Sequence, residues 1–449
     1  MKYTILGAGL SGISASFHLG HDNCEIFEKN SYAGGHIYSE YLDGFTWDEG
    51  PHVSFTKHEY VRELFAKNTK GEYLEFPIST SNYYEGNWIP HPAQSNLWAI
   101  PMPLRDKCLQ DFLKTRGRID NEHTNYGEWL RLAFGDTFAE NFPQAYTEKY
   151  WTTHPKNLTT DWVGDRVFYP KVSDVEQGYI SPLPQQTHYI THIRYPKKAG
   201  YFSFARALYD GANLHFNKEV IGIDFESQKI TFSDGSIHRY DKLINTLPLP
   251  ILIERSSAPI AVKEAAKALR CSSVLLVNVT AIHATARKEN WMYVYDKDKL
   301  STRINCTELL SPNNAPTGKT GVQVEVYFSS YRPKLETDEQ IAQQVCNELI
   351  EMGLIQHKID IESCHTRWIQ WANVIFDHSR RDAQTVVLDY LKQYGLRYEE
   401  DELEPMTDWN NKKNLNPGKI ILAGRFAQWK YFWTDDCVLR GKLIADSIK

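Results

Sequence analysis

The N-terminal part of the chain alternates apolar runs with glycine-rich turns. Residues 3–6 form an apolar run typical of a buried strand, and residues 24–28 form a second one. Between them we expect a helix that ends at Gly20, because Ile13 and Phe17 lie on one face. This order of strand, turn, helix and strand is typical of the start of an αβ layer.

The period of the apolar positions changes twice in the rest of the chain. Helical spacing first predicts helices over 58–68, 104–117 and 126–151, with a break at Pro143. Segments 76–103 and 167–200 are rich in proline, so short strands and loops are expected there. A period of two then predicts strands at 214–216, 219–225 and 229–232. Buried strands are expected at 241–246 and 420–423, and strands of a second sheet at 272–281, 291–295, 302–307 and 321–329. The later helices are expected over 260–270, Asp338–Met352 and Asp382–Tyr394, and from about Asp435 to the end.

These elements predict an α/β fold in which one domain is built from separate parts of the chain. Elements of an αβ layer open and close the sequence, while a helical stretch and an antiparallel sheet lie between them. The prediction is a discontinuous, Rossmann-like nucleotide-binding domain with a helical insertion and a second, antiparallel-sheet domain. The nucleotide-binding domain takes 1–75, 205–255 and 410–449, the insertion takes 100–165, and the sheet domain takes 76–99, 166–204 and 256–409.

Composition narrows the class of protein further. The 50 Lys and Arg residues face 56 Asp and Glu residues, and the resulting net charge of −6 argues against nucleic-acid binding. The seven cysteines are odd in number and no CxxC occurs, which argues against a disulfide framework or a metal site. A reducing, cytoplasmic location without a membrane span is therefore expected. Aromatic residues make up 13% of the chain, which suits either a ring-stacking pocket or core packing.

The first turn carries a GxGxxG motif at Gly7, Gly9 and Gly12. In a dinucleotide site the first glycine allows the tight turn, the second lets the pyrophosphate approach the backbone, and the third lets the helix pack closely on the sheet. Leu10 and Ser11 begin the helix, whose N–H groups would point at the phosphates. Glu28 lies 21 residues after Gly7, close to the spacing of a carboxylate that binds ribose. A glycine turn of another αβ fold is the alternative.

The next stretch resembles the second glycine motif of glutathione-reductase-type FAD enzymes. It runs through Glu28-Lys29 and then Ala33-Gly34-Gly35-His36. The resemblance implies FAD rather than NAD, and it assigns Lys29, Gly35 and His36 to the cofactor. Most amine-oxidase-like members carry arginine where this chain has His36. The same resemblance adds Val220 and Asp435 to the cofactor-binding residues.

Four further segments resemble UDP-galactopyranose mutase. They are Gly50-Pro51-His52-Val53, Tyr146-Thr147-Glu148-Lys149-Tyr150-Trp151, Thr302-Arg303-Ile304, and Gly424-Arg425-Phe426 through Tyr431. The resemblance implies that His52 lies beside the flavin and that Gly424 and Arg425 contact FAD. It also implies that a substrate is bound by Tyr146, Trp151, Tyr189, Arg303 and Tyr431, with His52 and Arg303 as the catalytic residues.

The chain departs from the mutase pattern at several positions. Trp433 stands where the family has a carboxylate, and the family's second phosphate-binding arginine has only Arg166 and Arg194 as candidates. The segment 194–201 looks more like the YPxGG stretch of protoporphyrinogen-oxidase-like proteins. Without the resemblance, Tyr146 and Trp151 read as packing residues, Arg303 as a surface ion pair and His52 as a core histidine.

Three functions are compatible with these features. The first, implied by the resemblance, is ring contraction of a UDP-hexopyranose through an adduct on N5 of reduced flavin, with Arg303, Tyr146 and Tyr431 holding the pyrophosphate. It needs reduced FAD, so NAD(P)H or another external reductant is possible, and a nucleotide sugar of polysaccharide biosynthesis is the expected substrate. The second is an FAD oxidoreductase of the amine-oxidase type, and the third is a non-catalytic flavoprotein. A homodimer is possible in each case.

Overall fold

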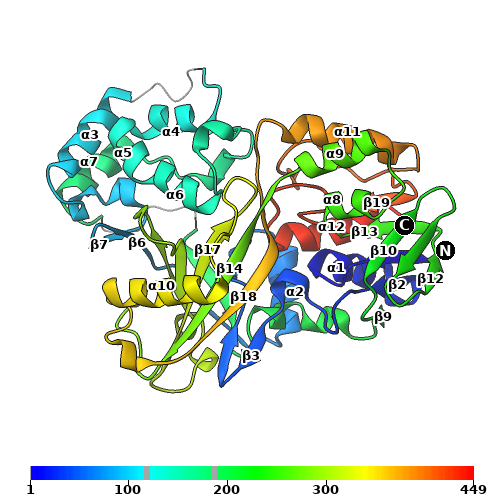
Figure 1. Cartoon of the computed structure of the whole chain (residues 1–449), viewed down its shortest axis with the longest axis horizontal. Helices are drawn as coiled ribbons and strands as arrows, with labels where there is room; N and C mark the ends of the chain where they lie inside the picture. The colour runs from blue at the N-terminus through cyan, green and yellow to red at the C-terminus, as the bar shows by residue number, and fades with distance from the viewer. Residues whose placement is uncertain (1, 116–121, 184–189, 449) are drawn as a thin grey trace.

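The computed structural model describes residues 2–115, 122–183 and 190–448. Figure 1 shows three parts: an αβ layer that contains both termini, a large sheet beside it, and a cluster of helices above that sheet. The αβ layer and the large sheet each combine segments that lie far apart in the sequence. The predicted α/β class, with a discontinuous αβ domain, a helical insertion and a second sheet domain, is confirmed.

The αβ layer is built on a five-stranded parallel sheet with the order β19-β13-β1-β2-β9. Its strands are β1 (Tyr3–Leu6), β2 (Cys24–Phe27), β9 (Leu214–His215), β13 (Lys242–Asn245) and β19 (Ile420–Leu422). Strands of a covered parallel sheet are apolar on both faces, which explains their continuous apolar runs. Helices α1 (Leu10–Leu19) and α12 (Thr434–Asp446) pack tightly together, because a Cβ on Gly441 would lie 2.5 Å from the backbone nitrogen of Ala15.

The second sheet has seven strands in the order β18-β14-β17-β16-β15-β6-β7. They are β6 (Thr80–Tyr84), β7 (Asn87–Pro90), β14 (Cys271–Ala281), β15 (Trp291–Val294), β16 (Arg303–Cys306), β17 (Thr320–Phe328) and β18 (Ile361–Val374). The predicted antiparallel sheet is in fact mixed, since β15 and β6 pair in parallel. Helix α10 (Asp338–Glu351) packs on it and starts with a capping box at Thr337.

Strand β18 was not predicted from the sequence. It is an edge strand in which exposed and partly buried residues alternate over most of its length. Polar residues such as His365, Arg367 and Gln370 interrupt the apolar pattern that identifies a strand. Its length of 14 residues is instead set by pairing with β14, which fixes the register through Leu276 opposite Arg367.

The helical cluster corrects two predictions. The helical stretch expected over 126–151, with its break at Pro143, is three helices: α4 (Tyr126–Phe134), α5 (Asp136–Asn141) and α6 (Pro143–Tyr150). The predicted break at Pro143 is confirmed, and a second break occurs at Gly135, which has a φ of 79°. Helix α7 (Val172–Ile180) lies in a segment that was expected to be loop, and it packs against α3 (Leu104–Thr115).

The remaining elements connect these parts. Strands β10 (Val220–Asp224), β11 (Lys229–Phe232) and β12 (Ile237–Arg239) form a small antiparallel sheet. Two strand pairs, β3 (Glu40–Leu42) with β4 (Phe45–Trp47) and β5 (Tyr73–Pro77) with β8 (His192–Pro196), lie between the glycine turns and the large sheet. The other helices are α2 (Glu59–Asn68), α8 (Leu249–Glu254), α9 (Ile260–Ala268) and α11 (Arg380–Lys392).

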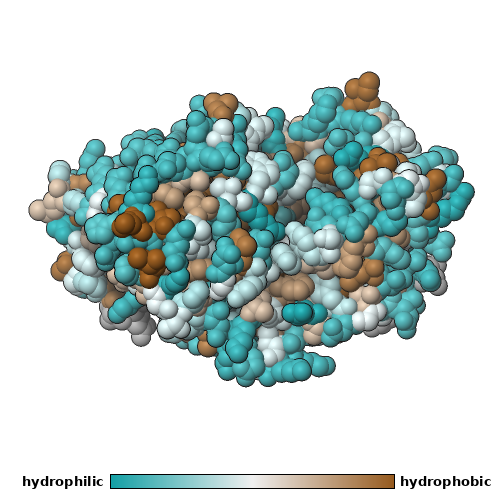
Figure 2. All heavy atoms as spheres, turned by 60° about the horizontal axis from the view of Figure 1, so that its bottom comes forward, coloured by the Kyte–Doolittle hydropathy of each residue, from teal (hydrophilic) through white to brown (hydrophobic). Residues whose placement is uncertain are grey.

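The face of the molecule drawn in Figure 2 is mainly polar, and its apolar side chains form small groups separated by hydrophilic ones. Among the described residues, no helix has the length and apolar character needed to cross a membrane.

Asp48, which follows β4, is a buried junction between the αβ layer and the β5–β8 pair. Its carboxylate accepts hydrogen bonds from the Tyr195 hydroxyl (2.6 Å) and from the backbone nitrogen of Tyr201 (3.0 Å). Burial is the largest effect on this group and raises its pKa to about 6, although the hydrogen bonds oppose the shift. The folded protein therefore holds a proton on Asp48 over a pH range in which the unfolded chain has lost it.

We expect Asp48 to make the protein less stable as the pH rises from about 4 to about 6. The raised pKa gives stability that is fully present below the unfolded-state pKa and is lost as the pH passes the folded-state pKa, by on the order of 3 kcal/mol. The melting temperature of wild type, measured relative to that of Asp48→Asn, should therefore be higher at pH 4.5 than at pH 7, because the asparagine does not titrate. The exposed control Asp22→Asn should follow wild type, and parallel pH profiles for wild type and Asp48→Asn would contradict this assignment.

Candidate cofactor and substrate site

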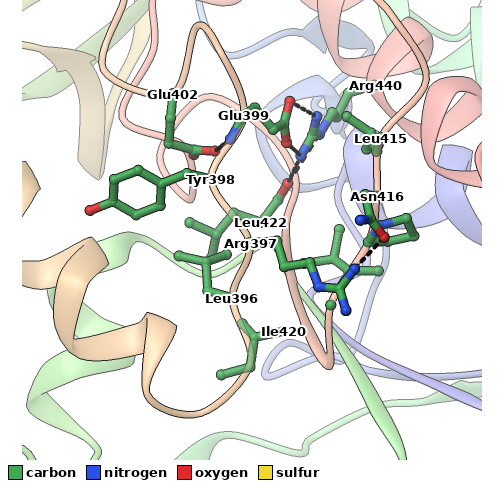
Figure 3. A pocket seen from close by; sticks show the side chains of 13 residues that line it. Leu396, Arg397, Tyr398, Glu399, Glu402, Leu415, Asn416, Ile420, Leu422 and Arg440 are labelled. Carbon is green, nitrogen blue, oxygen red and sulfur yellow. Dashed lines mark hydrogen bonds and ion pairs between the residues drawn. The ribbon is translucent and has the colours of Figure 1, made fainter.

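A cavity of about 1040 Å³ opens where the αβ layer, the large sheet and the helical cluster meet. Ligand sites of open α/β sheets lie at the carboxyl ends of the strands, and this cavity begins there, at the turns after β1, β2, β13 and β19. A second cavity, shown in Figure 3, has a volume of only about 30 Å³, which is room for about one water molecule. The large cavity is therefore the candidate site.

The first glycine turn forms an anion-binding helix start at one end of the cavity. Gly7 has a φ of 100° and donates from its nitrogen to the carbonyl of Phe27 (2.8 Å). Gly9 precedes α1 without a side-chain cap, so the first N–H groups of the helix face the cavity edge lined by Leu10 and Ser11. Gly12 does not line the cavity. A Cβ at this position would overlap the carbonyl oxygen of Gly7, so the glycine is needed for close packing inside the turn.

The second glycine motif packs directly on the first. Gly34 donates from its nitrogen to the carbonyl of Ala8 (3.0 Å), and a Cβ on Gly35 would lie 3.0 Å from the Cα of Gly9. The two motifs thus form one glycine-lined wall of the cavity, in which any larger side chain would fill the space beside α1. The next residue, His36, also lines the cavity and donates from its Nδ1 atom to the carboxylate of Glu49 (2.8 Å).

Glu28 ends β2 at the ribose-binding position that its spacing suggests. It is buried and accepts hydrogen bonds from the backbone nitrogens of Ala8 (2.8 Å) and Asn30 (2.9 Å), which fix its carboxylate at the cavity wall. Lys29 and Val220 line the cavity on the same side. A carboxylate held in this way can accept hydrogen bonds from two vicinal hydroxyl groups of a ribose.

The C-terminal part of the chain closes the opposite side of this wall. Gly424 has a φ of 105° and approaches α1 so closely that a Cβ would lie 2.6 Å from the Ser11 hydroxyl. Arg425 donates to the carbonyl of Phe432 (2.7 Å) and to the Asn373 side chain (3.2 Å), so it holds the loop before α12. Asp435, in the first turn of α12, also lines the cavity. These glycine-lined turns and the uncapped helix start fit the pyrophosphate and ribose of a flavin dinucleotide.

His52 lies on the wall between this region and the rest of the cavity. Its Nδ1 atom is enclosed and has no hydrogen-bond partner among the described residues. Burial lowers the pKa of His52 to about 4, and the nearby Arg303 guanidinium acts in the same direction. The imidazole is therefore neutral at neutral pH and offers a hydrogen bond rather than a positive charge.

The far side of the cavity is an aromatic wall. Tyr146 lies in the middle of α6 and Trp151 directly follows that helix. Tyr431 lies in the loop before α12, with its ring centroid 5.7 Å from that of Trp151. Tyr146 packs edge-on against Tyr293 of β15 at 5.3 Å. Burial raises the pKa of Tyr146 well above its usual value, so its hydroxyl keeps its proton and can donate. The structure thus brings these three predicted substrate residues together.

Arg303 lies between the aromatic wall and His52, but it is already paired. Its Nε and Nη2 atoms donate to the two carboxylate oxygens of Glu325, at 2.7 and 2.6 Å, and Tyr327 donates to the same carboxylate (2.9 Å). This bidentate geometry is the strong form of an arginine–carboxylate pair and leaves Nη1 for another acceptor. Arg303 is therefore no surface ion pair, and Glu325 offsets much of the charge it could offer to a phosphate.

Only one of the two candidates for the second phosphate-binding arginine lies in the cavity. Arg166 lines the cavity, where its guanidinium carbon lies 4.0 Å from the ring centroid of Tyr431 and 3.8 Å from that of Trp433. Arg194 lies outside the cavity on β8, where it is buried and donates to the carbonyl of Arg62 (3.3 Å). Of the two, only Arg166 is placed to contact a ligand in this cavity. Tyr189 lies outside the described residues.

Several cavity residues were not predicted from the sequence. Arg367 of β18 donates to Glu49 (2.6 Å), which also contacts His36, and Asn373 of β18 accepts from Tyr150 (3.2 Å) as well as from Arg425. Their roles depend on partners more than 200 residues away or on a strand that has no clear apolar period. A charged residue that directly precedes the Gly50-Pro51-His52 turn was the only local signal, and it pointed to Glu49.

Comparison with known proteins decides the family. A family model described as "Flavin containing amine oxidoreductase" matches residues 10–449, which is nearly the whole chain. The chain belongs to this family. Membership implies a flavin, in agreement with the glycine-lined wall.

Individual relatives within and around this family match smaller parts or share only the fold. Mitochondrial protoporphyrinogen oxidase of Nicotiana tabacum is 33% identical over 121 residues, 26% of this chain and 23% of the relative. The 4,4'-diapophytoene desaturase of Staphylococcus aureus strain MRSA252 is 35% identical over 79 residues, 17% of this chain and 16% of the relative. The chain thus matches less than a quarter of the length of either relative.

Two solved structures share the fold over essentially the whole chain. A reduced UDP-galactopyranose mutase superposes with a TM-score of 0.87 at 22% identity. The superposition covers 100% of this chain and 93% of the mutase chain. A putative protoporphyrinogen oxidase from Exiguobacterium sp. 255-15 has a TM-score of 0.72 at 15% identity, with coverages of 100% and 98%. The resemblances of the sequence to UDP-galactopyranose mutase and to protoporphyrinogen-oxidase-like proteins are therefore confirmed at the level of the fold.

Proposed function

We propose that this flavoprotein is an FAD-dependent isomerase of the UDP-galactopyranose mutase type, which acts on a nucleotide sugar. The observation that carries the proposal is the meeting of Tyr146, Trp151, Arg303 and Tyr431 in one cavity with the glycine-lined wall. These residues come from three separate parts of the chain, and packing alone does not require hydroxyl and guanidinium donors to meet on a cavity wall. A diphosphate needs such donors.

The chain's own residues give each part of the substrate a place. Tyr146, Tyr431 and the Nη1 atom of Arg303 donate hydrogen bonds to the diphosphate, and Trp151 packs against the ring of the sugar or the base. The neutral His52 donates or accepts a hydrogen bond at the flavin without adding charge. When bound in its reduced form, the flavin supplies the nucleophile for covalent catalysis. The protein orients the two molecules and excludes water from the space between them.

The proposal is tested with dithionite-reduced holoprotein and a panel of UDP-hexopyranoses. We expect conversion of one of them to a furanose isomer, without net oxidation of the flavin. The double variant Arg303→Ala/Glu325→Ala removes both charges of the buried pair, so no carboxylate is left unpaired. We expect it to bind UDP about 10-fold more weakly, the effect of losing one charge-assisted hydrogen bond. Arg131→Ala, in an exposed ion pair on α4, is the matched control. A panel left entirely unchanged would exclude this activity.

An oxidoreductase of the amine-oxidase or protoporphyrinogen-oxidase type is the second candidate. The observation that favours it is the family itself, together with the oxidoreductase names of the sequence relatives. Such an enzyme would bleach its oxidised flavin on addition of substrate alone, under anaerobic conditions and without dithionite. The mutase type predicts no such change, so the two candidates give opposite results in the same absorbance experiment.

A further inference from the structure

Two cysteines meet on the face of the large sheet that is opposite the cofactor cavity. Cys346 lies on α10 and is 7% exposed, and Cys364 lies on β18 and is exposed to solvent. Their thiols share a hydrogen bond, although the two residues are 18 positions apart in the sequence. The two thiols therefore lie close together in the folded chain.

The alternation of β18 supports this placement independently. Residues two apart in a strand face the same side, and Thr366 contacts Asp338 at the start of α10 (3.5 Å). Cys364 lies two residues before Thr366, so it points to the same helix. Cys346 belongs to the apolar cluster that α10 forms with Val279, the residue opposite Cys364 on β14. Helix and strand thus bring the two thiols together through ordinary packing.

The pair also has the chemistry of a reactive site. A thiolate is the nucleophile in thiol oxidation, and a thiol that receives a hydrogen bond loses its proton more easily. The hydrogen bond from Cys364 lowers the pKa of Cys346, and the nearby Lys358 acts in the same direction. By contrast, burial raises the pKa of Cys24, Cys108, Cys271, Cys306 and Cys437, which makes those thiols less reactive.

We propose that Cys346 and Cys364 are an oxidation site, at which a peroxide forms a reversible disulfide that links α10 to the edge strand β18. One thiolate attacks the peroxide O–O bond and becomes a sulfenic acid, with release of water. The second thiol then attacks that sulfur, the S–S bond forms, and a second water leaves. Two thiols lose two electrons and two protons to one hydrogen peroxide, which is reduced to two water molecules.

The link would act on the strand that also borders the candidate site. Arg367 lies three residues after Cys364 on the opposite face of β18, where it donates to Glu49 on the cavity wall (2.6 Å). A covalent bond from α10 restricts the movement of this edge strand relative to the sheet. The proposal does not depend on which reaction the flavin site performs.

The test is oxidation of the purified holoprotein with a small molar excess of hydrogen peroxide. We expect two of the seven thiols to disappear from a thiol count in denaturant, and peptide mapping without reductant to find residues 346 and 364 cross-linked. Closing a loop of this length should raise the melting temperature by about 3 °C in a chain of this size. Dithiothreitol should reverse both effects.

Variants distinguish the pair from general oxidation. Cys346→Ser and Cys364→Ser should each abolish the cross-link, while Cys271→Ser, in a partly buried cysteine of β14, should retain it. If either serine variant fails to fold, mapping of the wild type still decides the question. The proposal is overturned if Cys364 is found as a sulfinic acid beside an intact Cys346, if Cys364 joins two chains, or if all seven thiols survive.

Discussion

Replacing Gly9 by valine is expected to abolish flavin binding and to leave the fold intact. Gly9 has a φ of −77° in an extended conformation, which valine adopts readily. A Cβ at this position would meet only the Cα of Gly35, at an ordinary contact distance of 3.9 Å. The added methyl groups would instead occupy the space in front of the first N–H groups of α1, where the pyrophosphate binds.

The expected loss of flavin affinity is at least about 100-fold, because the pyrophosphate would lose its contacts with the helix start. It is measured as the flavin content of the purified protein and by fluorescence titration of the apoprotein, with circular dichroism as the check on folding. Gly222→Val is the matched control, since this β10 glycine has no Cβ contact closer than 3.6 Å and does not line the cavity. A Gly9→Val protein with a full flavin content would place the cofactor elsewhere.

This part of the site could be predicted from the sequence because its determinants are local. The turn after β1 needs Gly7, Gly9 and Gly12 within six residues, and Glu28 follows at the end of the next strand. The short buried strands were equally visible, since both of their faces are covered and the apolar run is continuous. Four strands of the second sheet, β14 to β17, were found to within one or two residues.

The rest of the site depends on contacts that no local pattern records. Arg303 was predicted as a phosphate ligand, but its pairing with Glu325 becomes apparent only when β16 and β17 lie side by side. Arg367 and Asn373 were missed because β18 is half exposed, and a polar edge strand resembles a loop in the sequence. The break at Gly135 was missed because glycine also occurs within helices. The structure explains it by the close approach of α3, where a Cβ would lie 2.5 Å from the backbone of Asp111.

Replacing Arg440 by leucine is expected to lower the free energy of unfolding by about 3 kcal/mol. Arg440 on α12 is 2% exposed and forms a bidentate pair with Glu399, at 2.9 and 2.6 Å, as Figure 3 shows. Breaking a buried pair from one side costs about 3–5 kcal/mol, because a charge remains buried without its partner. The lower end is expected here, since Lys412 still contacts Glu399 at 2.7 Å.

The measurement is urea unfolding followed by tryptophan fluorescence, and two further variants make it decisive. Lys442→Ala, on the same helix, removes an exposed pair with Asp446 and should change stability by less than about 0.5 kcal/mol. The double variant Arg440→Leu/Glu399→Leu should recover more than half of the loss, because two apolar side chains replace the whole pair. If Arg440→Leu unfolds like wild type, the pair does not hold this segment in place.

The effect should extend to the candidate site, because the segment that Glu399 anchors also supports the aromatic wall. Six residues after Glu399, the carbonyl of Pro405 accepts a hydrogen bond from the backbone nitrogen of Tyr431 (2.7 Å), and the next residue, Met406, contacts Arg166 through its sulfur (3.2 Å). Arg440→Leu should therefore weaken substrate binding at a urea concentration that leaves the protein folded, while flavin content stays unchanged. Equal losses of flavin and substrate binding would instead indicate unfolding of the whole αβ layer.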